Sequence, residues 1–152
     1  MRPTTLLALV PLTALAATLL PATPVQAAPA DRYAGSARAA TNVARVRHDL
    51  PRLRTSPCLT RFAERQARRM ATRQEMFHQD LQPVLDRCGL RMTGENVAYG
   101  YRTGASAVRD GWMLSEGHRD NLLNPPYRLI GIGAERDGDG TWYVAQVFGR
   151  SA

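Results

Sequence analysis

The sequence contains no lysine. All 20 of its basic residues are arginine, against 13 aspartate and glutamate residues. A chain without lysine cannot form a Schiff base with a carbonyl substrate, cannot supply the lysine of a phosphate-binding P-loop and cannot use a Ser-Lys dyad. The formal net charge of +7 permits adsorption to anionic cell-wall polymer, lipid headgroups or nucleic acid, but it selects none of them.

Long hydrophobic runs are also missing, except at the N-terminus. There Arg2 precedes an apolar stretch over residues 6–20, and small residues then end at Ala27. The stretch is shorter than the roughly 20 apolar residues that a membrane-spanning helix needs. A charged start, an apolar middle and a small-x-small end are typical of a cleaved signal peptide. We expect residues 1–27 to be a signal peptide and residues 28–152 to be one secreted, extracellular domain.

Cysteine is scarce, since Cys58 and Cys88 are the only two. In an exported protein two cysteines are expected to pair. Closing a loop of about 30 residues would stabilise the fold by roughly 3–4 kcal/mol. A reactive or metal-binding thiol is the alternative, but neither cysteine has the short-range spacing of a zinc knuckle.

Hydrophobic spacing predicts two helices in the first half of the chain. Apolar residues three and four positions apart predict a helix over residues 36–50, after a short mobile lead-in at residues 29–35. Ser56 followed by Pro57 is a typical helix start, and the apolar residues from Leu59 onward follow a helical period. The opposite face of this second helix carries arginines 61, 65, 68, 69 and 73. A solvated helix face explains them better than nucleic acid does, because no aromatic residues are interleaved with them.

The second half of the chain predicts a third helix and a hairpin. We expect residues 79–93 to be irregular, residues 96–99 to be extended and residues 105–114 to be helical. Two apolar runs, residues 129–134 and 142–148, flank a strong Asp-Gly turn sequence and predict a hairpin with one buried face. Helices first and a hairpin last indicate an α+β fold rather than alternating βαβ units.

Histidine is scarce as well: the chain has three, at positions 48, 78 and 118. His48 is expected to be a surface or packing residue on the first helix. His78 and His118 follow predicted helices, and Glu95 lies where a loop meets a strand, which are places where sites are often assembled. Two imidazoles and a carboxylate suit zinc with an open position for water. From the residues alone, a structural role for these three side chains remains open.

Several motifs together resemble the CAP superfamily of cysteine-rich secretory proteins, antigen 5 and pathogenesis-related proteins. Residues 94–98 (Gly-Glu-Asn-Val-Ala) are similar to the family's Gly-Glu-Asn box. Trp112, followed by Gly-His-Arg-Asp-Asn-Leu-Leu at residues 117–123, resembles the signature of the bacterial branch. Residues 127–149 are similar to its closing hairpin, so the resemblance covers residues 38–149 in the family's order.

The resemblance implies a three-layer α-β-α sandwich with a small, mainly antiparallel central sheet, one disulfide and a cleft lined by histidines and carboxylates. Carried over by position, the implied metal ligands are His78, Glu95 and His118, with zinc as the expected divalent ion. The family's second carboxylate corresponds in position to Ser115, and Glu116 is next to it. One residue along a helix turns a side chain by about 100°, which leaves the direction of Glu116 open. Asn96, Arg119 and Asn121 are expected to brace loops.

The functional expectation is therefore a secreted binding protein for a small apolar ligand such as a sterol or fatty acid, for a divalent metal, or for both. Two alternatives stay open. One is a metal-dependent hydrolase acting on peptide or cell-envelope polymer, although the G-x-S-x-G and H-E-x-x-H patterns are absent. The other is an interaction protein held on an anionic cell-wall or envelope polymer by its arginines. No catalytic residue and no specific nucleic-acid partner is predicted.

Overall fold

Within residues 29–151, the part of the chain that the computed structural model describes, four strands form one sheet in the order β1-β3-β4-β2. β1 (Arg54–Thr55) runs parallel to β3 (Leu129–Arg136). β4 (Trp142–Ser151) is antiparallel both to β3 and to β2 (Leu90–Tyr99). The sheet is therefore small and mainly antiparallel, as predicted, and the expected signal peptide lies outside the described residues.

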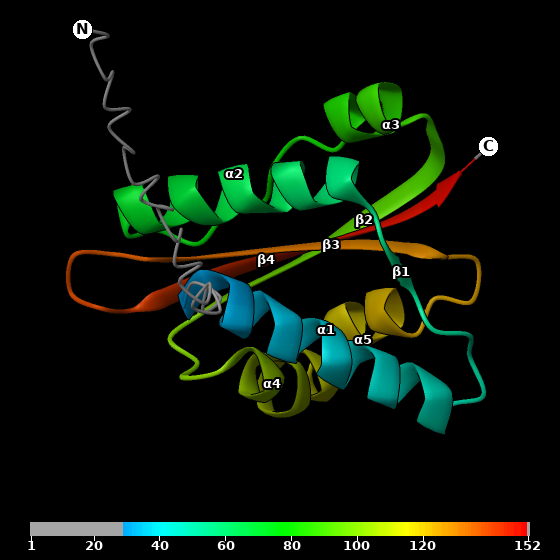
Figure 1. Cartoon of the computed structure of the whole chain (residues 1–152), viewed down its shortest axis with the longest axis horizontal. Helices are drawn as coiled ribbons and strands as arrows, with labels where there is room; N and C mark the ends of the chain where they lie inside the picture. Colours follow the sequence, from blue (N-terminus) through cyan, green and yellow to red (C-terminus); the bar gives the residue numbers. More distant parts are fainter. Residues whose placement is uncertain (1–28, 152) are drawn as a thin grey trace, which may run out of the picture.

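Helices cover both faces of this sheet (Figure 1). α2 (Pro57–Arg73) and α3 (Gln82–Cys88) lie on one face, whereas α1 (Pro29–Arg47), α4 (Gly104–Ser106) and α5 (Glu116–Leu122) lie on the other. This arrangement confirms the predicted α+β class and the three-layer α-β-α sandwich. In the described part of the chain no helix is long and apolar enough to cross a membrane.

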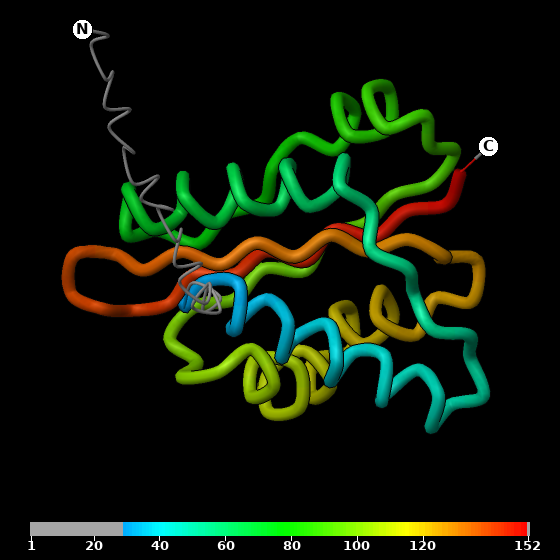
Figure 2. The backbone as a smooth tube through the Cα atoms, in the orientation of Figure 1, coloured from blue at the N-terminus to red at the C-terminus, as the bar shows by residue number. Residues whose placement is uncertain are grey.

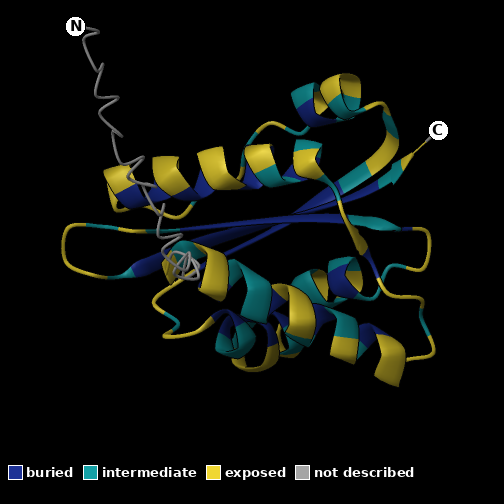
Figure 3. Cartoon of the chain, in the orientation of Figure 1, coloured by how far each residue is buried: buried dark blue, intermediate teal, exposed yellow. Residues whose placement is uncertain are grey.

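Both faces of β4 are buried, although the sequence predicted one core face. Tyr143 and Val147 pack into the cluster under α2, while Val144 and Phe148 pack into the cluster on the α1 side. Figure 3 shows the central strands buried between the helical layers. The second face is buried because α1, α4 and α5 cover it, which alternation within one strand does not reveal.

Two glycines of β3 allow α2 to lie directly against the sheet. A Cβ atom at Gly131 would lie 2.2 Å from the backbone of Leu59 and Thr60, and one at Gly133 would lie 2.2 Å from the backbone nitrogen of Glu64. Any side chain at either glycine would push the helix away. The close contact buries one face of α2 and turns its arginine face outward, and Figure 2 shows the chain reaching α2 from α1 through β1.

α1 begins at Pro29, so the predicted mobile lead-in at residues 29–35 is wrong. Tyr33 is the physical reason, because its ring packs on Trp142 with centroids 4.7 Å apart and its hydroxyl donates to the carbonyl of Tyr101 at 3.1 Å. These contacts order a segment whose small residues carry little helical signal of their own. The helix ends at Arg47, three residues before the predicted end.

The prediction of an irregular segment at residues 79–93 is also wrong, since it contains α3 and the start of β2. Pro83 lies in the first turn of α3, where proline starts a helix rather than breaking one. Gly89 closes the helix in the left-handed region with φ 60°. The predicted disulfide is confirmed: Cys88 at the end of α3 is bonded to Cys58 in the first turn of α2.

The helical segment predicted at residues 105–114 is present in three parts. α4 continues into a π-helical turn, η1 (Ala107–Gly111), and then into a 3-10 turn, η2 (Trp112–Leu114). The indole nitrogen of Trp112 donates to the carbonyl of Val97 at 3.0 Å, which ties this segment to β2. The sequence did not predict α5, the helix that carries His118.

A buried arginine joins α1 to the loop that follows α5. The guanidinium of Arg45 donates to the carbonyl oxygens of Pro51 at 3.0 Å, Leu122 at 2.9 Å, Asn124 at 3.0 Å and Tyr127 at 3.3 Å. The residue has no exposed surface. One side chain thus donates to four backbone carbonyls, and it fixes the C-terminal end of α5. Two of these carbonyls, those of Pro51 and Leu122, receive no other loop or side-chain hydrogen bond within residues 29–151.

We predict that Arg45→Met lowers the free energy of unfolding by about 3 kcal/mol, because the aliphatic stem remains while buried carbonyls lose their donors. Arg47→Met is the matched control on the same helix, since Arg47 is exposed, and it should change stability by no more than about 0.5 kcal/mol. Urea unfolding followed by circular dichroism measures both. Equal effects of the two substitutions would contradict the role assigned to Arg45.

Candidate functional site

The buried carboxylate of Glu95 is the centre of the candidate site. Its side chain, which extends from β2, is 1% exposed. It accepts hydrogen bonds from Nδ1 of His78 at 2.9 Å, from the backbone nitrogen of Gln79 at 3.1 Å and from Nε2 of Gln79 at 2.6 Å. The side chain of His78 is 58% exposed. The pair therefore joins a buried, fully hydrogen-bonded acid to an imidazole that is open to ligands.

His118 lies in the first turn of α5 and faces the same region. Its Nδ1 atom is hydrogen-bonded to Oγ of Ser115 at 2.8 Å. Burial lowers the pKa of His118 below the ordinary histidine value, and the neighbouring imidazole of His78 lowers it further. His118 is therefore neutral near pH 7, which is the form that donates a lone pair.

Two asparagines hold the backbone on either side of the site. Nδ2 of Asn96 donates to the carbonyl of His118 at 3.0 Å, and Nδ2 of Asn121 donates to the carbonyl of Glu95 at 3.2 Å. The two amides also bond to each other, from Nδ2 of Asn121 to Oδ1 of Asn96 at 3.1 Å. Asn96 and Asn121 were expected to brace loops, but they instead join β2, which carries Glu95, to α5, which carries His118.

The Gly-Glu-Asn motif also needs its glycine. A Cβ atom at Gly94 would lie 2.4 Å from the hydroxyl oxygen of Tyr127 and 2.9 Å from Oδ1 of Asn121. A larger residue would displace the asparagine that supports Glu95. In this motif Gly94 thus allows close packing, Glu95 provides a buried hydrogen-bond acceptor, and Asn96 links β2 to α5.

Glu116 is exposed at the start of α5, and among the described residues it forms no ion pair with either histidine. Ser115 reaches His118, whereas the carboxylate of Glu95 is bonded to His78. These are two separate pairs, and within residues 29–151 no serine, histidine and acid form the relay that a serine hydrolase requires. This observation concerns a serine hydrolase, and the metal-dependent hydrolase stays an alternative.

The predicted ligands His78, Glu95 and His118 are brought to one region, but not as three free ligands. In the part of the chain that the structure describes, no group of three histidine, cysteine, aspartate or glutamate side chains is arranged to hold one ion. The oxygens of Glu95 are occupied, whereas Nε2 of each imidazole has no hydrogen-bond partner among the described residues. The donor set fits two imidazoles with Glu95 as the outer partner that orients His78.

Sequence reasoning missed Gln79, which supplies two of the three hydrogen bonds to Glu95. The one sequence feature that could have pointed to Gln79 is its position directly after the predicted ligand His78. Glutamine is common at exposed positions, and its role here depends on β2 lying beside the segment that follows α2.

A hollow outside the histidine site lies between α1 and the helical segment 104–114, on the face of the sheet that α1 covers. Its volume is about 670 Å³. Its apolar lining consists of Ala39, Ala40, Val43, Ala44, Ala105, Val108 and Met113. Arg47, His48 and Arg109 also line it, and within residues 29–151 none of these three forms an ion pair. We call this hollow the α1–α4 groove.

The chain matches the CAP family, described as the cysteine-rich secretory protein family, over residues 38–148. It therefore belongs to this family. Among solved structures, an extracellular protein of Bacillus anthracis that contains an SCP domain is 27% identical with a TM-score of 0.70, covering 86% of this chain and 45% of that one. A cysteine-rich secretory protein of Staphylococcus aureus is also 27% identical with a TM-score of 0.70, covering 84% and 40%.

Two curated relatives come from Bacillus subtilis (strain 168). "Uncharacterized membrane protein YlbC" is 35% identical over 103 residues, which are 63% of this chain and 30% of the relative. "Uncharacterized protein YkwD" is 31% identical over 105 residues, or 64% and 40%. The chain thus spans less than half the length of the curated relatives it matches. An outer surface protein of Borrelia burgdorferi, 19% identical with a TM-score of 0.68 and coverages of 76% and 90%, supports the fold alone.

We predict that His118 titrates below the ordinary histidine pKa of about 6.5, because burial and His78 both disfavour its charged form. His78→Gln should raise the pKa of His118 toward the ordinary value, whereas His48→Gln should leave it unchanged. An NMR titration of the imidazole C–H signals measures all three proteins.

The same shift has a consequence for stability. A histidine whose pKa is lower in the folded state binds more protons when unfolded, so His118 makes the fold less stable as pH falls through about 6.5. At higher pH this effect vanishes, because both states are neutral there. A pKa of His118 at or above the ordinary value of about 6.5 would show that the site does not disfavour its charge.

Proposed function

We propose that this protein is a secreted CAP-domain binding protein that holds a fatty-acid-like ligand in the α1–α4 groove. The observation that carries the proposal is an apolar hollow with unpaired cations in its lining. Secretion is supported by the signal-peptide pattern at residues 1–27. The name of the similar protein from B. anthracis, "extracellular", agrees with it.

The size and lining of the groove suit an acyl chain. Ligand pockets usually measure about 300–1,000 Å³, and this one is about 670 Å³. Its alanines leave space between the helices, and Val43, which is 44% exposed, offers apolar surface to a ligand. Each methylene buried from water contributes about 0.8 kcal/mol, so a long acyl chain gains enough to bind.

The charges of the groove favour an acid over a neutral sterol. Arg47 lies in the last turn of α1, and Arg109 lies in η1 on the other wall. A guanidinium forms two parallel hydrogen bonds with a carboxylate. A fatty acid therefore fits both the lining and the cationic groups, whereas a sterol hydroxyl would leave the arginines unused.

We predict that the purified domain binds a fluorescent fatty acid saturably and that Ala44→Phe, which fills the groove, weakens binding by about tenfold. Ala44→Ser keeps the volume and is the control. Arg47→Gln with Arg109→Gln should weaken binding of the acid several-fold but leave the fatty alcohol of equal length unaffected. Arg52→Gln with Arg102→Gln is the charge-matched control, since both residues are exposed outside the groove.

Two results would exclude this function. One is the absence of saturable fatty-acid binding by a folded protein. The other is binding that Ala44→Phe does not change, which would place the ligand elsewhere. Suppose a sterol binds as tightly as the acid and the arginine substitutions do not weaken its binding. The ligand of the groove would then be neutral rather than acidic.

The histidine pair supports a second function, modest binding of a divalent metal, in the first place zinc. His78 and His118 would ligate through Nε2, because the Nδ1 atom of each is already hydrogen-bonded to a side-chain oxygen. Glu95 would orient His78 and increase its basicity. When bound, such an ion offers an open position that polarises a ligand oxygen. The fold does not require the ion, because the disulfide and two hydrophobic clusters stabilise it without metal.

Calorimetry with zinc near neutral pH tests this second function. We predict that His78→Ala and His118→Ala each abolish most of the binding, because a single remaining imidazole holds the ion weakly. Glu95→Gln should weaken it by about tenfold, as loss of an outer partner does, and His48→Ala should not matter. Affinity should fall as pH drops below about 6.5, where protons compete for the imidazoles. If wild type shows no binding, or if both alanine variants bind like wild type, the histidine pair is structural.

A further inference from the structure

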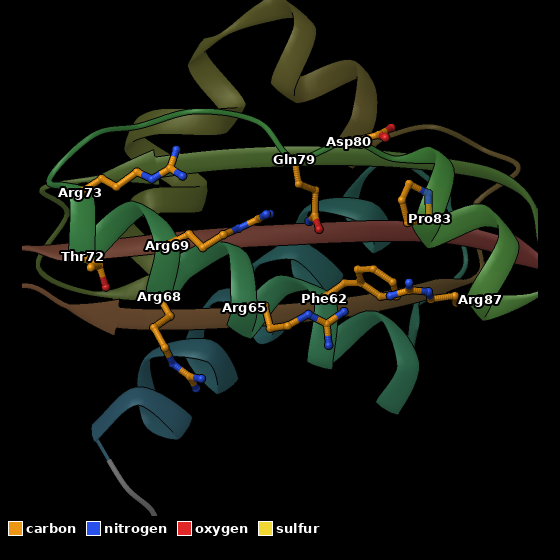
Figure 4. A pocket seen from close by; sticks show the side chains of 10 residues that line it. All are labelled: Phe62, Arg65, Arg68, Arg69, Thr72, Arg73, Gln79, Asp80, Pro83 and Arg87. Carbon is orange, nitrogen blue, oxygen red and sulfur yellow. The ribbon is translucent and has the colours of Figure 1, made fainter.

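An arginine-lined hollow lies on the outward face of α2, on the opposite side of the sheet from the α1–α4 groove. Its volume is about 510 Å³. Figure 4 shows it between α2 and the segment that leads through Gln79 and Pro83 to α3. Five arginines line it: Arg65, Arg68, Arg69 and Arg73 from α2, and Arg87 from the last turn of α3. We call it the arginine groove.

Three of the groove's arginines from α2, Arg65, Arg69 and Arg73, are held in place by neighbours that do not neutralise them. The guanidinium of Arg65 lies over the ring of Phe62, 4.4 Å from its centroid, and that of Arg73 lies 4.9 Å from the centroid of Phe77. Arg69 donates to the side-chain oxygen of Gln66. Such contacts reduce the rotamer freedom that a ligand would otherwise have to remove.

The positive charge of the groove is largely unpaired. Asp80 is its only acidic lining residue. Of the five arginines, Arg68 forms an ion pair, with Glu135 at 3.8 Å, and both partners are largely exposed. Within residues 29–151 the other four have no carboxylate partner. A concave surface with this charge attracts an anionic ligand.

The spacing of the arginines indicates an extended ligand. Arg65 and Arg73 are eight positions apart on one helix, which corresponds to about 12 Å along its axis. A single phosphate cannot reach both ends, whereas successive phosphates of one chain can. Guanidinium groups bind phosphate oxygens through two parallel hydrogen bonds, and Arg87 offers such a group from the opposite wall.

The aromatic rings of this region are covered, which argues against nucleic acid. Phe62 is 7% exposed beneath Arg65, and Phe77 is covered by Arg73. Proteins that bind single strands use open aromatic faces on which bases stack.

We infer that the arginine groove binds a linear phosphodiester chain without bases, of the glycerol phosphate type. The chain would lie along α2, with its phosphates on Arg65, Arg69 and Arg73 and with Arg87 closing the other side. Gln79 connects the groove to the candidate site, because it lines the groove and donates to Glu95. The inference does not depend on fatty-acid binding, which uses the opposite face of the sheet.

Fluorescence anisotropy with a labelled glycerol phosphate oligomer of about six units tests this inference. Wild type should bind it, with affinity falling about tenfold between about 50 and about 200 mM salt, because the phosphates release counterions. The triple variant Arg65→Gln, Arg69→Gln, Arg87→Gln should bind about tenfold or more weakly. The matched control, Arg52→Gln, Arg54→Gln, Arg102→Gln, removes the same charge from exposed positions outside the groove and should stay within about threefold of wild type.

NMR amide shifts of wild type during titration with the unlabelled oligomer provide a second measurement that needs no variant. The shifts should concentrate on α2 and on residues 77–87. Equal weakening of oligomer binding in both triple variants, or amide shifts spread over the whole surface, would show that net charge attracts the oligomer and that the arginine groove is not its binding site. Tighter binding of a single-stranded oligonucleotide, or of a polyglutamate of equal charge, would overturn the assignment to a base-free phosphodiester. Failure of wild type to bind the oligomer would overturn the inference itself.

Discussion

A buried chain of amide hydrogen bonds determines where the candidate site forms. Nε2 of Gln146 on β4 donates to Oγ1 of Thr41 on α1 at 2.8 Å, and Oε1 of Gln146 accepts from Nδ2 of Asn96 on β2 at 3.3 Å. Asn96 then holds the carbonyl of His118. A buried amide without a partner costs about 1–3 kcal/mol. The hydrogen bonds therefore favour one relative placement of α1, β4, β2 and α5. The position of His118 beside His78 follows from that placement.

The same layered plan separates two ligand-accessible surfaces. The sheet is buried on both faces, so neither surface communicates with the other through open space. On the α1 side, alanines leave an apolar groove with cations in its lining, whereas on the α2 side five arginines line the groove. Arginine supplies the charge in both, because the chain has no lysine. Its planar, permanently charged group suits both the carboxylate proposed for one groove and the phosphates proposed for the other.

Some features were determined by the sequence alone because their signals are local. Ser56 and Pro57 predicted the start of α2, and both strands of the C-terminal hairpin were predicted to within three residues at each end. The pairing of Cys58 with Cys88 followed from export and from the count of two. The family followed from motifs in a fixed order, and the match over residues 38–148 confirms it.

Other features were decided by the tertiary structure, because they depend on residues distant in sequence. α1 starts early because Tyr33 meets Trp142, and Glu95 is a hydrogen-bonded partner of His78 because β2 lies beside the segment that follows α2. The arginines of α2 look like an ordinary solvated face in the sequence. They line a groove only because α3, tied back by the disulfide, brings Arg87 to its other wall. Local spacing determines which face of a helix is polar, whereas only packing determines what that face encloses.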